Sequence, residues 1–244
     1  MTFLFVRENR EYLLAPGETL ETDLGVLEVP ENVAPGEEIE THLGESFVCR
    51  ALRGPDLFEH FERTGAPMMP RDVGLVLGHT GAADGDRVLD AGTGTGVLAA
   101  YLGRAGCHVD TFEQKAAFAT VARENMRLAG VEEVVEVHTG DVAADETLDS
   151  LSDTSYDVLT LDTGDAPSVV ERAPDLLVAG GSLAVYSPFV EHTREVVEAA
   201  EAAGLASVET FETIQRRMDF DERGSRPATA GVGHTGYLTF ARRP

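Results

Sequence analysis

The chain of 244 residues has no tryptophan, two cysteines and a single lysine, Lys115. Cys49 and Cys107 lie far apart and form no Cys-x-x-Cys pair, so the sequence predicts neither a disulfide framework nor a zinc site. No apolar run approaches the ~18 residues of a membrane-spanning helix, and the start of the chain is too short and too acidic for a signal peptide. We therefore expect a soluble, cytoplasmic protein with no membrane association and no metal.

Positive charge is scarce as well. The chain has 43 acidic and 19 basic residues, a net charge of −24, and all basic residues but one are arginine. Because 43% of the residues are hydrophobic, the chain can bury a core, which excludes an acidic disordered polypeptide. The carboxylates are spread along the chain, which favours halophilic adaptation, where salt screens their repulsion. The alternative, an acidic face for a cationic partner, would concentrate them in a run.

The sequence divides into three segments. Residues 1–54 contain an internal repeat, in which Ala15–Gly25 recurs as Ala34–Gly44, and each copy reads as a Pro-Gly type II turn followed by a strand. We expect a small β-rich module there. Residues 55–69 form a connecting helix and loop, and residues 70–244 carry the functional domain.

Strands and helices alternate in the third segment. This order predicts an α/β fold with a doubly wound, seven-stranded, mostly parallel sheet of Rossmann-like type, which binds ligands at the carboxyl ends of its strands. No helix separates the last two strands, so we expect them to pair antiparallel. The predicted strands are 87–90, 108–113, 134–138, 156–162, 182–186, 207–213 and 236–241, and the predicted helices are 97–104, 115–129, 167–178 and 190–203.

A glycine-rich turn follows the first of these strands. Gly92, Gly94 and Gly96 alternate between a strand and a helix, so the backbone can approach a ligand closely and the helix N-terminus can donate to a carboxylate. A dinucleotide fingerprint would need a third small residue where Val97 stands, which disfavours NAD. S-adenosylmethionine has the carboxylate that such a turn binds.

Acidic residues stand at three further strand ends. Glu113 follows the turn by about 20 residues, where a carboxylate accepts the ribose hydroxyls of an adenosyl ligand. Asp141 is placed to accept from an adenine amino group, and an ordinary loop aspartate is the alternative. Asp162 closes an apolar strand beside the crevice for a methyl acceptor, and a carboxylate there is costly unless it is used.

With these features the chain resembles the class I S-adenosylmethionine-dependent methyltransferases, and among them the tRNA (adenine-N1)-methyltransferases that act on the T-loop. The more specific motifs are Pro70-Arg71-Asp72, Arg226-Pro227-Ala228-Thr229 and the stretch from His234 to Arg243. The family also has a small N-terminal β module. The resemblance implies a homotetramer that methylates N1 of adenine 58 of tRNA, and it leaves open whether adenine 57 is a second target.

The resemblance also implies roles for individual residues. Asp162 would be catalytic, in contact with the target base. Cofactor binding would fall to Met69, Gly92, Gly94, Thr95, Gly96, Val97, Leu98, Glu113, Phe118, Asp141, Val142 and Asp162. Binding of tRNA would fall to Arg71, Asp72, Arg226, Thr229, His234 and Thr235.

The chain departs from the family at two places. Met69 stands where the family often has an aromatic residue or histidine, and Thr163-Gly164-Asp165 replaces a proline-containing loop after Asp162.

The chemistry of the acceptor favours N1 of adenine over the exocyclic amine. Methylation of N1 creates a cation, which a carboxylate at the adenine edge would stabilise. The run of Asn or Asp, two prolines and an aromatic residue that marks amine methylases is absent from this strand end.

Two alternatives remain open. One is a class I methyltransferase with a protein or small-molecule acceptor, which would lack the family-specific motifs. The other is a non-catalytic tRNA-binding subunit, which would have lost the glycine turn or Asp162. The arginines Arg216, Arg217, Arg223 and Arg226 form either a positive patch for tRNA or a solvated surface.

Overall fold

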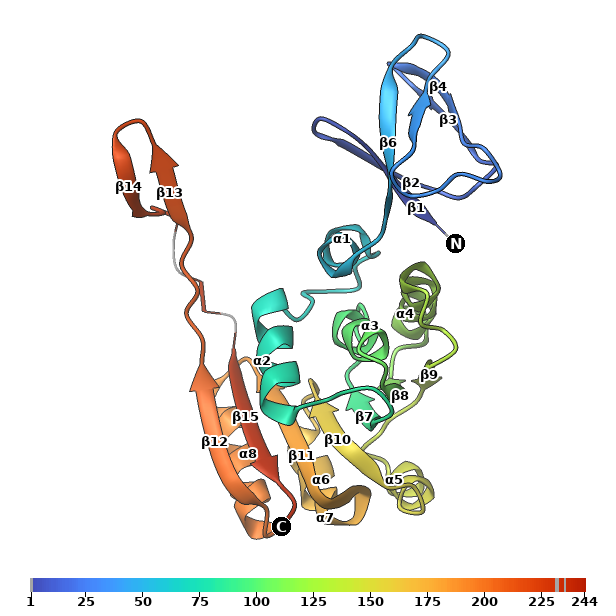
Figure 1. Cartoon of the computed structure of the whole chain (residues 1–244). Coiled ribbons are helices and arrows are strands. Elements are labelled where there is room, and N and C mark those ends of the chain that lie inside the picture. Colours follow the sequence, from blue (N-terminus) through green and yellow to red (C-terminus); the bar gives the residue numbers. More distant parts are fainter. Residues whose placement is uncertain (1, 231–232, 235) are drawn as a thin grey trace. The chain divides into compact units, whose positions relative to one another are not determined.

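The computed structural model describes residues 2–230, 233–234 and 236–244. The chain divides into two compact units (Figure 1). The first comprises Met1–Phe61 and Arg127–Gly130, and the second comprises Glu62–Met126 and Val131–Pro244. Among the described residues, no helix is both long enough and apolar enough to cross a lipid bilayer.

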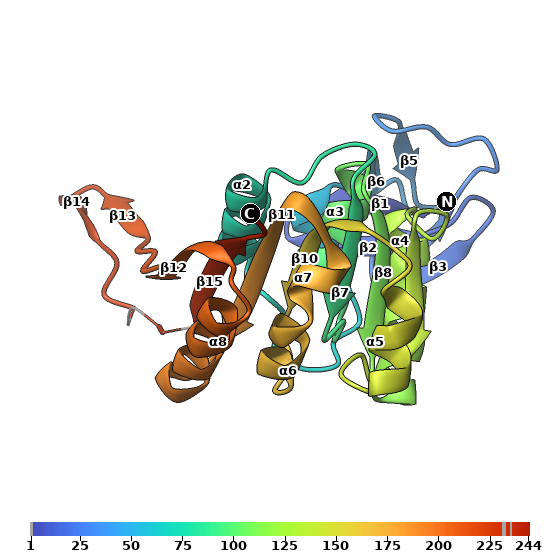
Figure 2. The same cartoon turned by 90° about the horizontal axis from the view of Figure 1, so that it is seen from below.

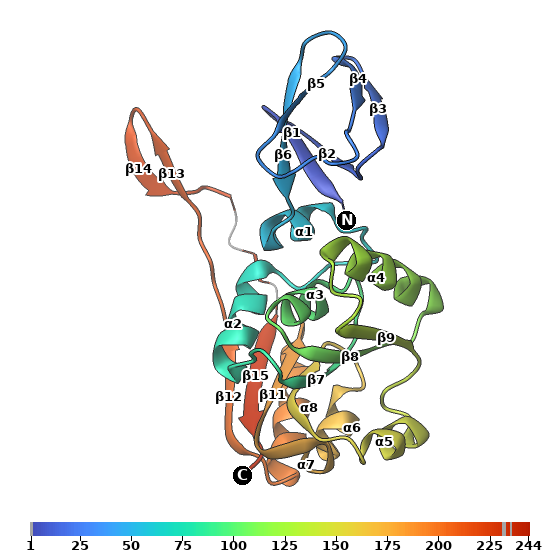
Figure 3. The same cartoon turned by 45° about the vertical axis from the view of Figure 1, so that its right-hand side comes forward.

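The first unit contains a small antiparallel β module. Its four-stranded sheet has the order β2-β1-β6-β5, and a separate hairpin pairs β3 with β4 (Figure 3). Phe3, Phe5, Leu27 and Phe47 are buried in its core. The elements are β1 (Phe3–Arg7), β2 (Arg10–Leu14), β3 (Thr19–Thr22), β4 (Gly25–Glu28), β5 (Glu38–Glu40), β6 (Ser46–Ala51) and α1 (Gly54–His60).

The sequence repeat corresponds to a repeated turn. The two turns span Ala15–Glu18 and Ala34–Glu37, and in both the N–H of the last residue donates to the first carbonyl, at 3.2 and 3.1 Å. The glycine at the third position has φ of +81° and +99°, which confirms the predicted type II turn. The glutamate carboxylate accepts a hydrogen bond from the first N–H, at 2.6 and 3.2 Å, and so closes each turn a second time.

The second unit is a doubly wound α/β domain, as predicted. Its sheet has the order β12-β15-β11-β10-β7-β8-β9, and β15 runs antiparallel to both β11 and β12. Figure 2 shows α2 and α3 on one side of the sheet and α5, α6 and α8 on the other. The strands are β7 (Arg87–Ala91), β8 (His108–Glu113), β9 (Val135–Thr139), β10 (Tyr156–Leu161), β11 (Leu177–Ser187), β12 (Ala206–Glu212) and β15 (Tyr237–Arg242).

The helices bury apolar side chains against both faces of this sheet. Leu89, Leu159 and Leu183 of the central strands are almost wholly buried in the core. The helices are α2 (Pro70–Thr80), α3 (Val97–Arg104), α4 (Ala116–Ala129), α5 (Asp145–Leu151), α6 (Ala166–Glu171), α7 (Ala173–Leu176) and α8 (Val190–Ala202).

The predicted helix 167–178 is wrong as a single element. The structure has α6 and α7 there, with Pro174 in the first turn of the second helix, because proline has no N–H to continue the first. Residues 177–181, the end of that predicted helix and the loop after it, instead form the start of β11. The sequence pattern also gave no indication of α2, of α5, or of the hairpin formed by β13 (Met218–Asp221) and β14 (Gly224–Pro227).

Candidate active site

The glycine turn lies between β7 and α3 at the carboxyl edge of the sheet. The N–H groups of Gly92 and Thr93 both donate to the carbonyl of Phe112 on β8, at 3.0 and 3.2 Å. Gly92 has a φ of +89°, and a Cβ at this position would overlap the carbonyl oxygen of Asp162. The turn therefore packs directly against the end of β10, and only glycine fits at this contact.

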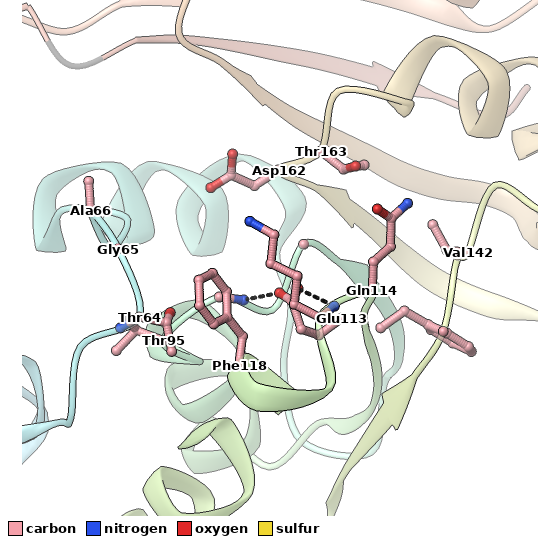
Figure 4. Close-up of a pocket in the computed structure, with 15 residues that line it drawn as sticks. Thr64, Gly65, Ala66, Thr95, Glu113, Gln114, Phe118, Val142, Asp162 and Thr163 are labelled. Atoms are coloured by element: carbon pink, nitrogen blue, oxygen red, sulfur yellow. Dashed lines mark hydrogen bonds between the residues drawn. The ribbon is translucent and has the colours of Figure 1, made fainter. Parts of the chain in front are cut away.

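Gly94, at the centre of the turn, is open on its outer side. Its φ is +53°, and the two atoms nearest to an added Cβ would lie 3.7 and 3.9 Å away. Its N–H donates to Oε2 of Glu113 at 3.0 Å, and the N–H of Lys115 donates to Oε1 at 2.9 Å (Figure 4). Glu113 is 8% exposed. Each carboxylate oxygen can accept a further hydrogen bond, so the group is prepared to bind a pair of hydroxyls.

The segment before α2 covers the turn from another side. Asn125 of α4 is buried, and its amide donates to the carbonyls of Glu62 and Thr95 at 3.0 and 2.8 Å, while its oxygen accepts from the Glu62 N–H at 3.1 Å. Thr64 donates its N–H to the Thr95 hydroxyl at 3.3 Å. The sequence pattern gave no indication of this arrangement, because it depends on contacts between residues 30 or more positions apart.

These elements enclose a cavity of about 300 Å³ at the carboxyl ends of β7, β8 and β10. The backbone of the glycine turn and the Glu113 carboxylate form the polar part of the cavity wall, and apolar side chains form the rest. Asp162 lies at the border of the cavity, where the loop after β10 begins (Figure 4). A smaller cavity of about 40 Å³ shares the glycine turn and Asp162. The larger one is lined by Thr64, Gly65, Ala66, Gly92, Gly94, Thr95, Phe112, Glu113, Gln114, Lys115, Phe118, Gly140, Val142, Asp162 and Thr163.

Asp162 is an exposed residue that lines both cavities, and the protein around its carboxyl group partly removes it from water. This desolvation, together with the negative charge of the neighbouring Asp90, raises the pKa of Asp162 to about 7. The group therefore changes charge near neutral pH, unlike an ordinary surface aspartate.

Asp90 is buried below the turn in a polar network that crosses three strands. Its two oxygens accept hydrogen bonds from the hydroxyls of Thr111 on β8 and Thr160 on β10, both at 2.6 Å. The Thr111 hydroxyl also lies 2.5 Å from that of Thr93. Burial raises the pKa of Asp90, and the two hydroxyl donors oppose that rise. The network fixes the backbone that carries the glycine turn.

Most of the predicted cofactor residues come together here. Gly92, Gly94, Thr95, Glu113, Phe118, Val142 and Asp162 line the larger cavity, and Gly96, Val97 and Leu98 line the smaller one. Asp141 does not line either cavity, and its Oδ1 instead accepts a hydrogen bond from the Ala143 N–H at 2.9 Å. Met69 is also outside both, immediately before α2, whereas its neighbour Met68 is buried and lines the smaller cavity.

The predicted tRNA-binding residues are dispersed. Arg71 and Asp72 begin α2, with Arg71 Nε 3.6 Å from the buried Asp72 carboxylate. Arg226 lies on β14, and Thr229 follows it; both are exposed. Thr235 lies outside the described residues.

His234 lies close to the carboxyl end of β11. Its Nε2 donates to the Pro188 carbonyl at 3.1 Å and its Nδ1 to the Glu212 carboxylate at 2.9 Å. Both partners are acceptors, and they raise the pKa of His234. The imidazole therefore joins the end of β12 to the turn after β11, and donation to both acceptors at once requires a proton on each ring nitrogen.

Lys115, the only lysine, lines the larger cavity. Its ammonium lies 4.7 Å from the centre of the Phe118 ring, within cation–π range. In a chain that has almost entirely replaced lysine by arginine, the one lysine thus lies at the ligand cavity.

A cluster of Asp110, Glu136 and His138 lies outside both of these cavities. Its potential ligand atoms are within 4.8 Å of one another. The two ring nitrogens of His138 face different carboxylates, at 3.4 Å from Asp110 and 3.8 Å from Glu136. A protonated imidazole satisfies both, and accordingly the pKa of His138 is raised by its bond to Asp110. The guanidinium of Arg87, 3.8 Å from Asp110, adds a further positive charge.

The glycine turn, the acidic end of β8 and the sheet order define a class I S-adenosylmethionine-dependent methyltransferase fold. Solved structures agree: an S-adenosylmethionine-dependent O-methyltransferase from Thermotoga maritima matches 99% of this chain and 92% of its own, with a TM-score of 0.80 and 25% identity. The structure of the tRNA (m1A58) methyltransferase TrmI from Aquifex aeolicus covers 100% of this chain and 97% of its own chain, with a TM-score of 0.74 and 21% identity.

The sequence comparisons identify the family. Residues 62–224 match the family described as tRNA methyltransferase complex GCD14 subunit. The tRNA (adenine(57)-N(1)/adenine(58)-N(1))-methyltransferase TrmI of Methanocaldococcus jannaschii is 30% identical over 97% of this chain and 92% of its own. The tRNA (adenine(58)-N(1))-methyltransferase TrmI of Thermus thermophilus is 30% identical over 75% of this chain and 72% of its own length. The chain belongs to this family of tRNA methyltransferases.

Proposed function

We propose that this protein transfers a methyl group from S-adenosylmethionine to N1 of an adenine in the T-loop of tRNA, at position 58 and, as in the Methanocaldococcus relative, with position 57 as a candidate second target. The observation that carries the proposal is the Asp162 carboxylate at the border of a cavity that the glycine turn and Glu113 line. Family membership adds the adenine acceptor.

The residues present fit the cofactor. Glu113 would accept the ribose hydroxyls, the glycine turn would approach the methionine carboxylate, and Phe118 and Val142 would contact the adenine ring. Asp90 and Asp162 would lie near the cationic end. When bound, the cofactor supplies a methyl group on a positively charged sulfur. Asp141 and Met69 keep their predicted cofactor roles as proposals, and both would have to reach the ligand from outside the cavity walls.

Asp162 would act on the acceptor. Adenine N1 already carries an in-plane lone pair, so no base is needed to create the nucleophile. Methylation leaves a positive charge on the ring, and a carboxylate at the N1–N6 edge would orient the amino group and stabilise that charge. The open side of Asp162 and its place at the end of β10 support this role.

Arg71, Asp72, Arg226, Thr229, His234 and Thr235 are proposed to bind the tRNA. Arg216, Arg217 and Arg226 are exposed, and no ion pair holds them among the described residues, whereas Arg223 pairs with Asp221 at 2.8 Å. Arg216 and Arg217 are adjacent in the chain, and the N–H of Ala228, two residues after Arg226, donates to the Arg217 carbonyl at 2.8 Å. These guanidinium groups would supply the local positive charge that a protein of net charge −24 needs towards phosphates.

We also propose a homotetramer, with the β13–β14 hairpin as one contact between copies. Along β13, Met218 and Phe220 point to one face and Asp219, which is opposite Arg226, to the other. Met218 is 44% exposed and Phe220 is 76% exposed. An isolated two-stranded hairpin is marginally stable in water, so burial of its apolar face against another copy would stabilise it. Light scattering of the wild type and of Phe220→Glu tests this.

We further propose that the enzyme works in the cytoplasm, at high salt and without a metal. Residues 1–54 would be an accessory β module of the catalytic domain that starts at residue 70. Dialysis against a chelator, followed by a methylation assay, tests the metal proposal.

Transcript tRNA and labelled S-adenosylmethionine test the main proposal. After incubation, the labelled nucleoside is identified and its position is mapped. Label in 1-methyladenosine at position 58 is the expected result. Label at another base, or transfer to a protein or small molecule but not to tRNA, would contradict it.

A further inference from the structure

Phe189 is an aromatic side chain that the assigned roles do not use. It is 67% exposed, and it follows β11 directly, as the residue before α8. The aromatic residues that line the cofactor cavity, Phe112 and Phe118, belong to β8 and α4. Phe189 instead belongs to the acceptor side of the sheet.

Strand register places Phe189 at the same edge as Asp162. β10 and β11 are parallel neighbours, and Leu161 pairs with Val185. Asp162 follows the last paired residue of β10, and β11 ends at Ser187, two residues before Phe189. Both side chains therefore leave the sheet at its carboxyl edge from adjacent strands, where doubly wound sheets bind ligands.

The backbone around Phe189 is fixed on both sides. Its carbonyl accepts hydrogen bonds from the N–H of Thr193 at 3.0 Å and from the Thr193 hydroxyl at 2.9 Å. The preceding carbonyl, of Pro188, accepts from His234. An exposed ring on a fixed backbone loses little conformational freedom when it is covered, which favours a role in binding.

An adenine that leaves the RNA stack loses its stacking energy, and enzymes that act on such bases restore part of it with an aromatic or apolar face. Resting on the proposed function, we infer that Phe189 stacks on the target adenine while Asp162 contacts the edge of that base. Phe189 would thus be a binding residue that positions N1. An exposed β11 turn that serves as a contact between copies of the chain is the competing explanation.

The absence of tryptophan from the chain gives a direct test. Phe189→Trp places the only indole at the proposed stacking position. Leu43→Trp, at a comparably exposed position with 63% exposure, is the matched control. Each full-length variant is titrated with a T-arm RNA hairpin in the presence of S-adenosylhomocysteine. A second RNA is abasic at the target nucleotide and otherwise identical.

We expect the T-arm RNA to quench the fluorescence of Phe189→Trp and the abasic RNA to quench it at least several-fold less, with no such difference for Leu43→Trp. In parallel, Phe189→Ala should lower the single-turnover methylation rate or the RNA affinity on the order of 10-fold to 100-fold, the loss typical of one base–aromatic stack. Cofactor affinity should stay unchanged, and Phe189→Tyr should restore most of the loss.

Equal quenching by the two RNAs, or none by either, would overturn the stacking role, as would a change of molecular mass in Phe189→Ala. The wild type is first assayed on the same T-arm RNA, which separates the two proposals. If the wild type methylates this RNA and Phe189→Trp fails the quenching test, only the stacking inference is wrong. If the wild type does not methylate it, the proposed function and the inference that rests on it both fail.

Discussion

The N–H of Gly94 donates a hydrogen bond to the Glu113 carboxylate across 3.0 Å, which joins the glycine turn to the end of the neighbouring strand. Glu113→Gln keeps the shape of the side chain and removes its charge. We expect cofactor affinity to fall at least about tenfold, or ~1.4 kcal/mol, because hydrogen bonds to a charged acceptor are the stronger ones. Calorimetric titration measures this, with the exposed Glu132→Gln as control. An unchanged cofactor affinity in Glu113→Gln would contradict the proposal that Glu113 binds the ribose hydroxyls.

Two glycines of the same turn should respond differently to alanine. At Gly94 the added Cβ meets no atom within 3.7 Å, so Gly94→Ala should stay folded, at a cost of about 1 kcal/mol for the left-handed backbone. It should nevertheless lose cofactor binding, because the Cβ projects where the ligand approaches. At Gly92 the Cβ overlaps the Asp162 carbonyl, so Gly92→Ala should lower the melting temperature far more. Equal melting temperatures for the two variants would contradict the claim that a Cβ has room at Gly94 and none at Gly92.

The pH dependence of methyl transfer should reflect Asp162. Burial and the charge of Asp90 raise its pKa to about 7, so its carboxylate form declines as the pH falls through 7. If the carboxylate is the active form, the single-turnover rate should rise with pH through this range, and Asp162→Asn should be slow at every pH. A wild-type rate that is flat between pH 5.5 and 8.5 would contradict the role.

The raised pKa of Asp162 also predicts that Asp162→Asn is more stable than the wild type. Since the folded pKa of Asp162 lies above the unfolded value near 3.9, the folded state binds more protons between those values, and its stability falls as the pH rises towards 7. Asp162→Asn should therefore be more stable than the wild type at pH 8, with a smaller difference at pH 4. Thermal unfolding at the two pH values provides the comparison.

The pair of Asp110 and His138 should stabilise the fold in a defined pH window. The pKa of Asp110 is lowered by its bond to His138, and that of His138 is raised by the same bond. The stabilisation from Asp110 is lost as the pH falls below about 4, and that from His138 is lost as the pH rises above about 6.5. His138→Gln should cost about 1 kcal/mol or less at pH 5.5, since the pair is partly exposed, and less still at pH 9. His108→Gln, on exposed β8 surface, is the control.

The acidic surface should make stability depend on salt. With a net charge of −24, repulsion among carboxylates acts over a Debye length of ~30 Å at 0.01 M salt and only ~3 Å at 1 M. The melting temperature should therefore rise steeply between these concentrations. An unchanged melting temperature would reject halophilic adaptation and favour the cationic-partner explanation.

The sequence was sufficient to predict those parts of the fold and the site that depend on local patterns. Gly92 and Asp162 directly follow strands with a clear apolar pattern, and Glu113 is the last residue of such a strand. Parallel strands bring their carboxyl ends to one edge of the sheet, so the proximity of the three residues could be predicted. The mostly parallel, seven-stranded sheet and the antiparallel pairing of its last two strands also followed from the alternation of strands and helices, whereas the order of the strands was not predicted.

The sequence was insufficient where a contact joins distant segments. Asn125 holds Glu62 and Thr95 through amide–backbone bonds, which leave no periodic pattern in the sequence. Asp141 shows the reverse case: its position fits a ligand contact, but its carboxylate caps the local turn at Ala143, as short aspartate side chains commonly do.

Single-turnover methylation of tRNA by Asp162→Ala, measured beside its cofactor affinity, tests the central claim most directly. The glycine turn and Glu113 should keep S-adenosylmethionine affinity within about tenfold of the wild type. The methylation rate should fall on the order of 10²- to 10³-fold, as expected when one contact to the transition state is removed. A rate close to that of the wild type would contradict the account, and it would make Asp165, three residues further on, the next carboxylate to test.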